Sequence, residues 1–172
     1  MSLVLLFFLL YSLARSIWIH RSLHFADDLV CSRGDLTQLC LLLTSVKTNS
    51  MGEELLNILS NNATTVFAPN DNGMEAIVDG IDLLSIDVIV NLLSYHVMLD
   101  EQILEMDFEC NEHLEMINGR KTATRCEKQY EKTKKTFQVG DGNTGDLPQI
   151  IDTDIFTCVG VIHIVNQVIL PK

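Results

Sequence analysis

The chain has 172 residues, 47% of them hydrophobic, which fits one globular domain with a short N-terminal extension. Its 12 Lys and Arg residues are outnumbered by 23 Asp and Glu residues, giving a formal net charge of −11. Because binding to nucleic acid requires a net basic face, this balance argues against nucleic acid as the main partner.

The N-terminus carries a short apolar run from Leu3 to Leu13. The run is too short to span a bilayer, which takes about 20 residues, but it suits the apolar core of a secretory signal. Ser12-Leu13-Ala14 supplies small residues of the kind that a signal peptidase reads. We therefore predict a signal peptide over residues 1–14, with an uncleaved anchor as the alternative. A lead-in without clear periodicity follows over residues 15–28, and then a domain over residues 29–172.

The first half of the domain has the periodicity of helices. Apolar residues three and four apart run from Leu36 to Leu43, and Asp35 is the expected N-cap. A second helix is predicted over Met51 to Ser60. Two more are predicted beyond a central strand, one over about Gly73 to Asp79 and one that Ser85 caps and that continues over residues 86–93.

The central strand is predicted from Thr64-Thr65-Val66-Phe67-Ala68, because β-branched and aromatic residues favour extended structure. Pro69 ends the ladder, and Asn70 or Asp71 can cap the next helix. A second strand is predicted over residues 94–99. Beyond it the pattern is mostly β, with a type I′ hairpin at Asn118-Gly119 and several short strands up to residue 170. Helices first and strands later predict an α+β domain.

The five cysteines have no metal-knuckle spacing, so no structural zinc site is expected. In an oxidising compartment, pairing of nearest neighbours predicts the disulfides Cys31–Cys40 and Cys110–Cys126. Each would stabilise the fold by about 3 kcal/mol in the chain-entropy model. Cys158 is then left over, as a buried thiol or as a competitor for the second pair. Sequence alone leaves the connectivity open.

Asn62-Ala63-Thr64 is an N-glycosylation sequon in the turn before the central strand. If the chain is secreted, Asn62 is expected to be exposed and glycosylated. In a cytosolic protein the same tripeptide would carry no meaning.

Three stretches in order resemble the signature elements of fasciclin domains. Thr65 to Asp71 resembles the first box, Tyr95-His96-Val97 resembles the central Tyr-His element, and Gly160 to Pro171 resembles the second box. The resemblance covers about Leu29 to Pro171. It implies a β-wedge of short strands with helices packed against it, in a secreted or surface-anchored adhesion or matrix protein.

The sequence departs from the family pattern at two positions. Val159 stands where the family usually has Asn, so the local turn is expected to lack a side-chain hydrogen bond. Met74 stands where an aromatic residue is common, which should matter little for packing.

Two histidines, His96 and His163, could serve as a base or as metal ligands in a secreted enzyme. Both lie in apolar runs without a serine, cysteine or carboxylate at a catalytic spacing, which favours structural roles. The resemblance also makes Tyr95 and His96 candidates for receptor binding. In a strand they would point to opposite faces, so that one of them belongs to the core.

The segment from Asp141 to Asp146 has the look of a calcium loop, but it lacks the required glycine and glutamate and is predicted to be a solvated turn. Neither a metal nor a cofactor is expected.

Basic residues gather just before this turn. Seven of the chain's 12 lie here: Arg120, Lys121, Arg125, Lys128, Lys132, Lys134 and Lys135. They could bind anionic matrix polysaccharide, or they could be solvated charges on two faces of a hairpin.

The expected function is that of a non-enzymatic extracellular adhesion or matrix protein. Its partner would be a cell-surface or matrix protein, or an anionic polysaccharide. The alternatives are a secreted enzyme that uses His96 or His163 and a structural module that acts through weak self-association.

Overall fold

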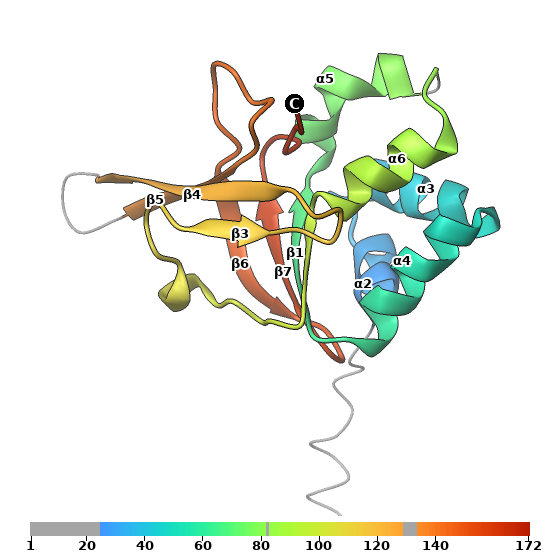
Figure 1. The fold of residues 1–172 in the computed structure, drawn as a ribbon, viewed down its shortest axis with the longest axis horizontal. Helices are drawn as coiled ribbons and strands as arrows, with labels where there is room; N and C mark the ends of the chain where they lie inside the picture. Colours follow the sequence, from blue (N-terminus) through green and yellow to red (C-terminus); the bar gives the residue numbers. More distant parts are fainter. Residues whose placement is uncertain (1–24, 82, 129–133) are drawn as a thin grey trace, which may run out of the picture.

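A computed structural model describes residues 25–81, 83–128 and 134–172, so the predicted signal peptide and Lys132 lie outside the described residues. Helices occupy one side of the molecule and strands the other (Figure 1), which confirms the α+β prediction. In chain order the elements are α2 (Ala26–Ser32), α3 (Thr37–Ser45), η1 (Val46–Thr48), α4 (Ser50–Asn61), β1 (Thr64–Pro69), α5 (Asp71–Ile81), α6 (Ile86–Ser94), β2 (Val97–Leu99), η2 (Glu105–Asp107), β3 (His113–Glu115), β4 (Lys121–Lys128), β5 (Lys134–Val139), β6 (Ile150–Phe156) and β7 (Val161–Val165).

The strands form two sheets, in the orders β2-β1-β7-β6 and β3-β4-β5. Among the described strands, β1 and β7 pair in parallel and the other neighbours are antiparallel. Backbone hydrogen bonds connect the sheets, from Ile117 to Val97 (2.8 Å) and from Gln138 to Pro148 (3.0 Å). The two sheets of the wedge are therefore joined along both edges: β2 contacts the turn between β3 and β4, and β5 contacts the segment before β6.

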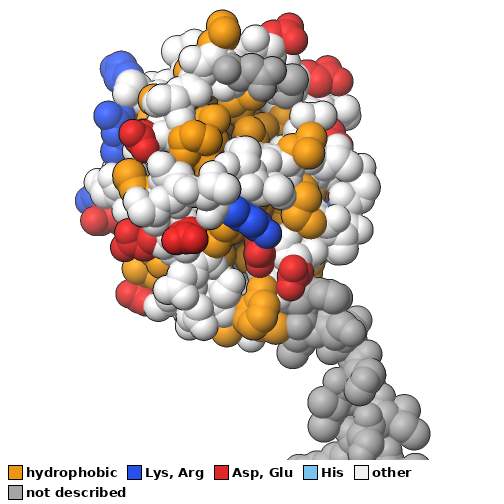
Figure 2. Space-filling model, turned by 90° about the vertical axis from the view of Figure 1, so that its right-hand side faces the viewer, with side chains coloured by type: hydrophobic (Ala, Val, Ile, Leu, Met, Phe, Trp, Pro, Cys, Tyr) orange, Lys and Arg blue, Asp and Glu red, His pale blue; other side chains and the backbone are white. Residues whose placement is uncertain are grey.

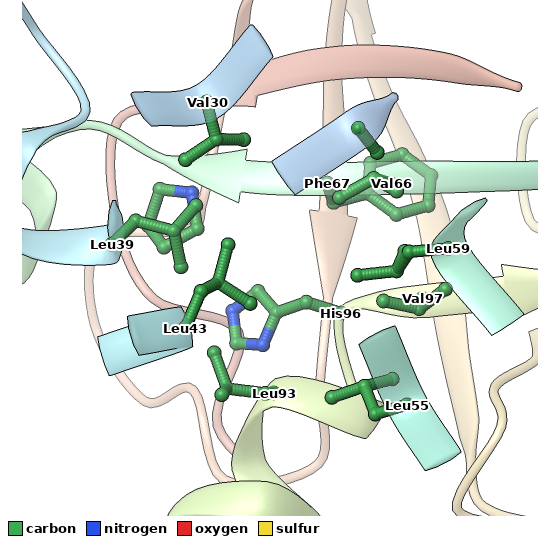
Figure 3. Close-up of a pocket in the computed structure, with 12 residues that line it drawn as sticks. Val30, Leu39, Leu43, Leu55, Leu59, Val66, Phe67, Leu93, His96 and Val97 are labelled. Carbon is green, nitrogen blue, oxygen red and sulfur yellow. The ribbon is translucent and has the colours of Figure 1, made fainter. Parts of the chain in front are cut away.

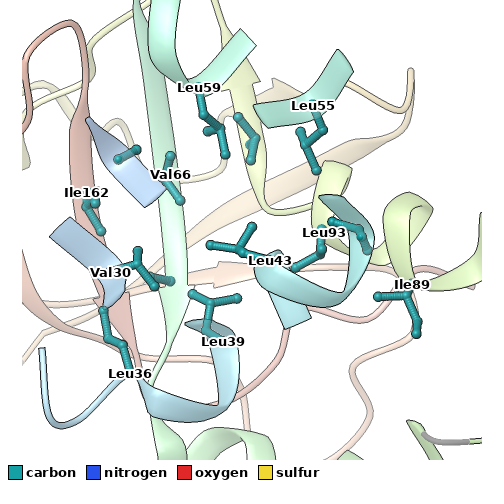
Figure 4. Packing of buried hydrophobic residues seen from close by; sticks show 14 of the residues in the cluster. Val30, Leu36, Leu39, Leu43, Leu55, Leu59, Val66, Ile89, Leu93 and Ile162 are labelled. Carbon is teal, nitrogen blue, oxygen red and sulfur yellow. The ribbon is translucent and has the colours of Figure 1, made fainter. Parts of the chain in front are cut away.

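The central strand β1 is buried along its whole length, because both of its faces are covered. Val66 and Ala68 belong to the apolar cluster under the helices, together with Ile162 and Ile164 of β7 (Figure 4). Phe67 points the other way, into a second cluster between the sheets. Strands covered on both faces have near-continuous apolar sequences, as the central stretch does.

Two residues directly after β1 cap two different helices of the helical layer. Asn70 caps α5, since its Oδ1 accepts a hydrogen bond from the Gly73 backbone N–H (2.8 Å). The next residue, Asp71, caps a different helix: its carboxylate accepts from the Gln38 N–H at 2.8 Å and from the Thr37 hydroxyl. The prediction that Asp35 caps this helix is wrong, because the Asp35 carboxylate instead binds Arg33 (2.8 Å).

Three further details differ from prediction. Helix α2 already begins at Ala26, within the expected lead-in, because Ala26 and Val30 pack into the core. Ser85 occupies the N-cap position of α6, but its side chain makes no capping hydrogen bond. The hairpin at Asn118-Gly119 is present, yet Gly119 alone has positive φ (+76°) there, so the turn is a type I turn with a glycine bulge and not type I′.

Both predicted disulfide pairs are present. Cys31–Cys40 joins α2 to α3, and Cys110–Cys126 ties the segment before β3 to β4. Cys158 is half-buried in the β6–β7 turn and belongs to neither pair.

Candidate functional site

The Tyr-His element does not lie in a strand. Helix α6 continues to Ser94, and the backbone N–H groups of Tyr95 and His96 still donate to carbonyls of its last turn. Although the chain is not extended here, the two side chains point to different sides: Tyr95 joins the cluster between the sheets, and His96 faces the residues under the helices. Both are buried, Tyr95 at 1% exposure and His96 at 4%. The prediction that they form an exposed binding patch is therefore wrong for their side chains.

The Tyr95 hydroxyl donates to the Lys121 carbonyl oxygen at 2.8 Å and so connects the end of α6 to strand β4. Gly140 leaves the room for the tyrosine ring, since a Cβ at this glycine would lie 2.8 Å from Tyr95 Cε1 and 2.3 Å from the Leu170 carbonyl oxygen. Tyr95 therefore acts as a structural connection between the helical and sheet layers.

The His96 ring is held by two backbone groups. The Ile169 N–H donates to Nε2 at 2.9 Å, which means that Nε2 carries no proton. Nδ1 then carries the proton and donates to the Leu92 carbonyl oxygen at 2.8 Å. Burial lowers the pKa of His96 to about 4, against a smaller opposing effect of the bond to Leu92. The ring is thus a neutral clamp between α6 and the C-terminal segment.

His163 of β7 is held in the same way on the other side of the sheet. Its Nε2 donates to the Ile103 carbonyl oxygen at 2.8 Å, and its Nδ1 faces the Asp154 N–H at 3.4 Å. The ring stacks on Phe67 and meets Phe108 edge-on, with centroid distances of 5.8 and 5.0 Å. Burial lowers its pKa. Both ring nitrogens of each histidine are thus occupied by backbone groups, so neither ring is placed to take a proton from a substrate.

An internal cavity of about 20 Å³ lies beside His96, room for about one water molecule. Its walls are almost entirely apolar side chains of α2, α3, α4, α6 and β1. In Figure 3 the His96 ring points into this space, between Leu43 and Leu93. A space of this size and lining is a packing gap and not a substrate pocket. Among the described residues no group of three or more His, Cys, Asp or Glu side chains could hold a metal ion.

The predicted turn over Asp141 to Asp146 is anchored by an amide. Asn143 Oδ1 accepts from the N–H groups of Gly140 and Leu170, both at 3.0 Å, and its Nδ2 donates to the Val168 carbonyl oxygen at 2.9 Å. These bonds tie the turn to the C-terminal segment.

The basic residues are divided by the hairpin. Arg120, Lys121 and Arg125 are exposed. Arg120 donates to the Lys172 carbonyl oxygen (2.7 Å) and Arg125 to the Asn111 side-chain oxygen (3.0 Å). In the ladders, Lys121 is opposite Glu115, Lys135 is opposite Glu127, and Lys128 is opposite Lys134. Strand alternation thus divides these positions between the two faces of the sheet.

A feature that the sequence analysis missed is a groove of about 420 Å³ between α3, α5 and α6, whose lining residues are mostly apolar but include Gln38 and Ser45. Figure 2 shows hydrophobic side chains gathered in a hollow on this helical face. Leu41 of α3 (62% exposed) and Leu84 before α6 (42% exposed) line it, with Ile81 and Ile89 deeper in the wall. One signal in the sequence could have indicated it: Leu41 is apolar, although the helical periodicity places it on the outer face of α3.

The family model of the fasciclin domain matches residues 35–171, most of the chain. The chain belongs to the fasciclin domain family. A similar solved structure is a FAS1 domain pair from the insect cell adhesion molecule fasciclin I, at 14% sequence identity and a TM-score of 0.56. The match covers 74% of this chain and 43% of that chain, so this chain spans less than half of the domain pair.

At this identity the likeness shows the fold alone, and the fold agrees with the β-wedge that the resemblance implied. Among curated proteins, none matches this sequence. No helix in the described part of this fasciclin domain is long and apolar enough to cross a membrane.

Proposed function

We propose that this fasciclin domain is an extracellular, non-enzymatic adhesion domain that binds a protein partner through the groove between α3, α5 and α6. The observation that carries the proposal is a groove wall with two exposed leucines, Leu41 and Leu84, over the buried side chains of Ile81 and Ile89. Contiguous apolar surface of this kind marks protein–protein contacts. The two disulfides and the membership of an adhesion-associated family support the extracellular location.

The charge around the groove indicates the chemistry of the partner. Asp79 near the end of α5 and Asp87 in the first turn of α6 are exposed on two of the helices that form the groove, on a chain of net charge −11. A partner segment with leucine-like side chains flanked by lysine or arginine would fill the groove and complement these carboxylates. Such a contact would be strengthened at low salt.

Adhesion of cells to the immobilised full-length chain tests the proposal. Leu41→Ser and Leu84→Ser remove apolar side chains from the groove, and we expect the double variant to lose most of the adhesion. Phe156→Ser is the matched control, because Phe156 is 54% exposed on β6, outside the groove. Far-ultraviolet circular dichroism and urea unfolding of each variant establish that the fold is intact.

Equal adhesion of the groove variant and the control would overturn the groove as the binding surface. A concentration-dependent dimer in sedimentation velocity, lost in the groove variant, would assign the groove to a second copy of the chain instead. Absence of adhesion by the wild-type chain would argue against the adhesion function itself.

A second candidate function is binding of anionic polysaccharide at β4. Arg120, Lys121 and Arg125 are exposed, and neither arginine is bonded to an Asp or Glu side chain within the described part of the chain. The register of Lys128 opposite Lys134 also places like charges at facing positions, an arrangement that a bound anion would stabilise.

Retention on a heparin column at low salt tests this second candidate. The variant Arg120→Gln/Lys121→Gln/Arg125→Gln should elute at clearly lower salt than the wild type, because fewer counterions are released on binding. Glu115→Gln is the control in the other direction: it removes a negative charge opposite Lys121 and should raise retention. Elution of the triple variant together with the wild type would contradict polysaccharide binding at this strand.

A further inference from the structure

Two neighbouring threonines of β1, Thr64 and Thr65, are both fully buried, but their hydroxyl groups differ. Thr65 Oγ1 donates to the Glu101 carbonyl oxygen at 2.8 Å and accepts from the Ile103 N–H at 2.9 Å. Thr64 Oγ1 has no hydrogen-bond partner among the described residues. A buried hydroxyl without a partner lowers stability. The Thr64 hydroxyl therefore makes no hydrogen bond that would stabilise the described part of the folded domain.

The same hydroxyl completes the sequon Asn62-Ala63-Thr64. We propose that Thr64 serves the attachment of an N-linked glycan to Asn62, and that this glycan is attached before β1 is enclosed in its sheet. The inference rests on the extracellular location in the proposed function, because the transfer takes place in the secretory pathway.

The transfer uses a lipid-diphosphate-linked oligosaccharide as co-substrate. Asn62 Nδ2 forms a bond to the anomeric carbon of the first sugar, and the bond from that carbon to the diphosphate breaks. The lipid diphosphate leaves, and one amide proton passes to solvent.

In the folded domain Asn62 is partly exposed, but the sequon backbone is hydrogen-bonded and Thr64 is fully buried. The Asn62 N–H donates to the Ile58 carbonyl oxygen at 3.0 Å, and the Ala63 carbonyl oxygen accepts from the Asp100 N–H at 2.8 Å. Thr64 pairs with Leu99 in the β1–β2 ladder. Gly160 of the β6–β7 turn packs so closely that a Cβ there would lie 2.7 Å from Thr64 Oγ1. A transferase cannot reach this hydroxyl in the folded state.

The order of synthesis leaves the sequon open for a time. The parallel partner of β1 is β7, which begins at Val161, 97 residues after Thr64. At about 5–20 residues per second, this stretch takes roughly 5–20 s to synthesise. During that interval β1 lacks its partner, so the sequon is accessible while the chain is being made and closed after it folds.

The position of Asn62 leaves the proposed binding surface free. The turn between α4 and β1 lies at the bottom of the molecule in Figure 1, whereas α5 and the α3–α6 region lie at its upper right. The glycosylated chain should therefore support adhesion as the unglycosylated chain does.

Translation of the full chain with endoplasmic-reticulum microsomes tests the proposal. The wild type should give a form whose mobility shift is removed by endoglycosidase H, and Asn62→Gln should not. Thr64→Val should lose the glycan and keep the wild-type urea midpoint or exceed it. Thr65→Val is the matched control, which should keep the glycan and unfold at lower urea, because its hydroxyl has two partners.

A second arm tests the order of events. Purified, oxidised and folded chain without a glycan should not be modified by the transferase, whereas the same chain, reduced and unfolded in urea and then diluted into the assay, should be. Equal modification of both samples would overturn the proposed order.

The outcomes separate this inference from the proposed function. A chain that is protected from protease inside the microsomes but has no glycan would overturn the glycosylation of Asn62 and leave the adhesion function intact. A chain that is not translocated would overturn the extracellular function and the glycosylation with it. A lower urea midpoint for Thr64→Val than for the wild type would show that the hydroxyl does serve the fold.

Discussion

The Tyr-His element and the groove between α3, α5 and α6 are opposite kinds of region in one molecule. Tyr95 and His96 belong to the family signature, yet they are buried, and their polar atoms bond to backbone groups. Leu41 and Leu84 belong to no signature motif, yet they are exposed and line a groove. The comparison teaches that here the signature residues hold the fold, while a surface suited to binding lies outside them.

His96→Ala gives the largest effect that this comparison predicts. The change leaves the Ile169 N–H and the Leu92 carbonyl oxygen without their partner and enlarges the cavity beside the ring. We expect a loss of about 3–5 kcal/mol in the free energy of unfolding, measured by urea denaturation. His113→Ala, at an exposed position of β3, is the matched control and should have almost no effect. A loss below about 1 kcal/mol for His96→Ala would show that the clamp is not a structural requirement.

The pH dependence of stability is the next effect in size. Burial lowers the pKa of His96 from 6.5 to about 4, so the unfolded chain binds a proton between these values and the folded chain does not. Stability is therefore fully present above about pH 6.5 and falls as the pH drops toward 4, by about 3 kcal/mol in total. His163, whose pKa is also lowered, contributes in the same direction.

Urea midpoints between pH 4 and pH 8 measure this dependence. The amide of His96→Gln can donate to the Leu92 carbonyl oxygen and accept from the Ile169 N–H, but it does not titrate. Its profile should be flatter than that of the wild type, with the remaining slope due to His163. Parallel profiles for the two proteins would exclude His96 as the titrating group.

Much of the fold was predictable because its signals are local. The strand before Pro69, the helix that Asn70 caps and the hairpin at Gly119 each follow from a few neighbouring residues. The cap of α3 was not predictable, since Asp71 reaches Thr37 from 34 residues further along the chain. The type I′ turn failed because Asn118 keeps a negative φ and Gly119 alone takes the left-handed conformation.

The candidate site was less predictable than the fold. Tyr95 and His96 were expected in a strand, whereas they follow the last turn of α6 and both are buried, so neither is left at the surface. The groove is formed where Leu41 of α3 meets Ile81 and Leu84, about 40 residues away in sequence, so no local pattern describes it. Local rules identify which residues are apolar, but tertiary packing decides which of them stay exposed.

Tyr95→Phe gives the smallest effect and the sharpest test of the comparison. The variant keeps the buried ring and removes only the hydroxyl that donates to the Lys121 carbonyl oxygen. We expect the free energy of unfolding to fall by about 1 kcal/mol, the net contribution of one such hydrogen bond. Because the side chain does not reach the surface, adhesion to the immobilised chain should equal that of the wild type.

Leu41→Ser/Leu84→Ser should give the reverse result in the same pair of assays, a small change in stability and a large loss of adhesion, since its side chains face solvent. If Tyr95→Phe instead lost adhesion while the urea midpoint moved little, the signature element would have to open during binding. The division between residues that hold the fold and residues that bind a partner would then be wrong.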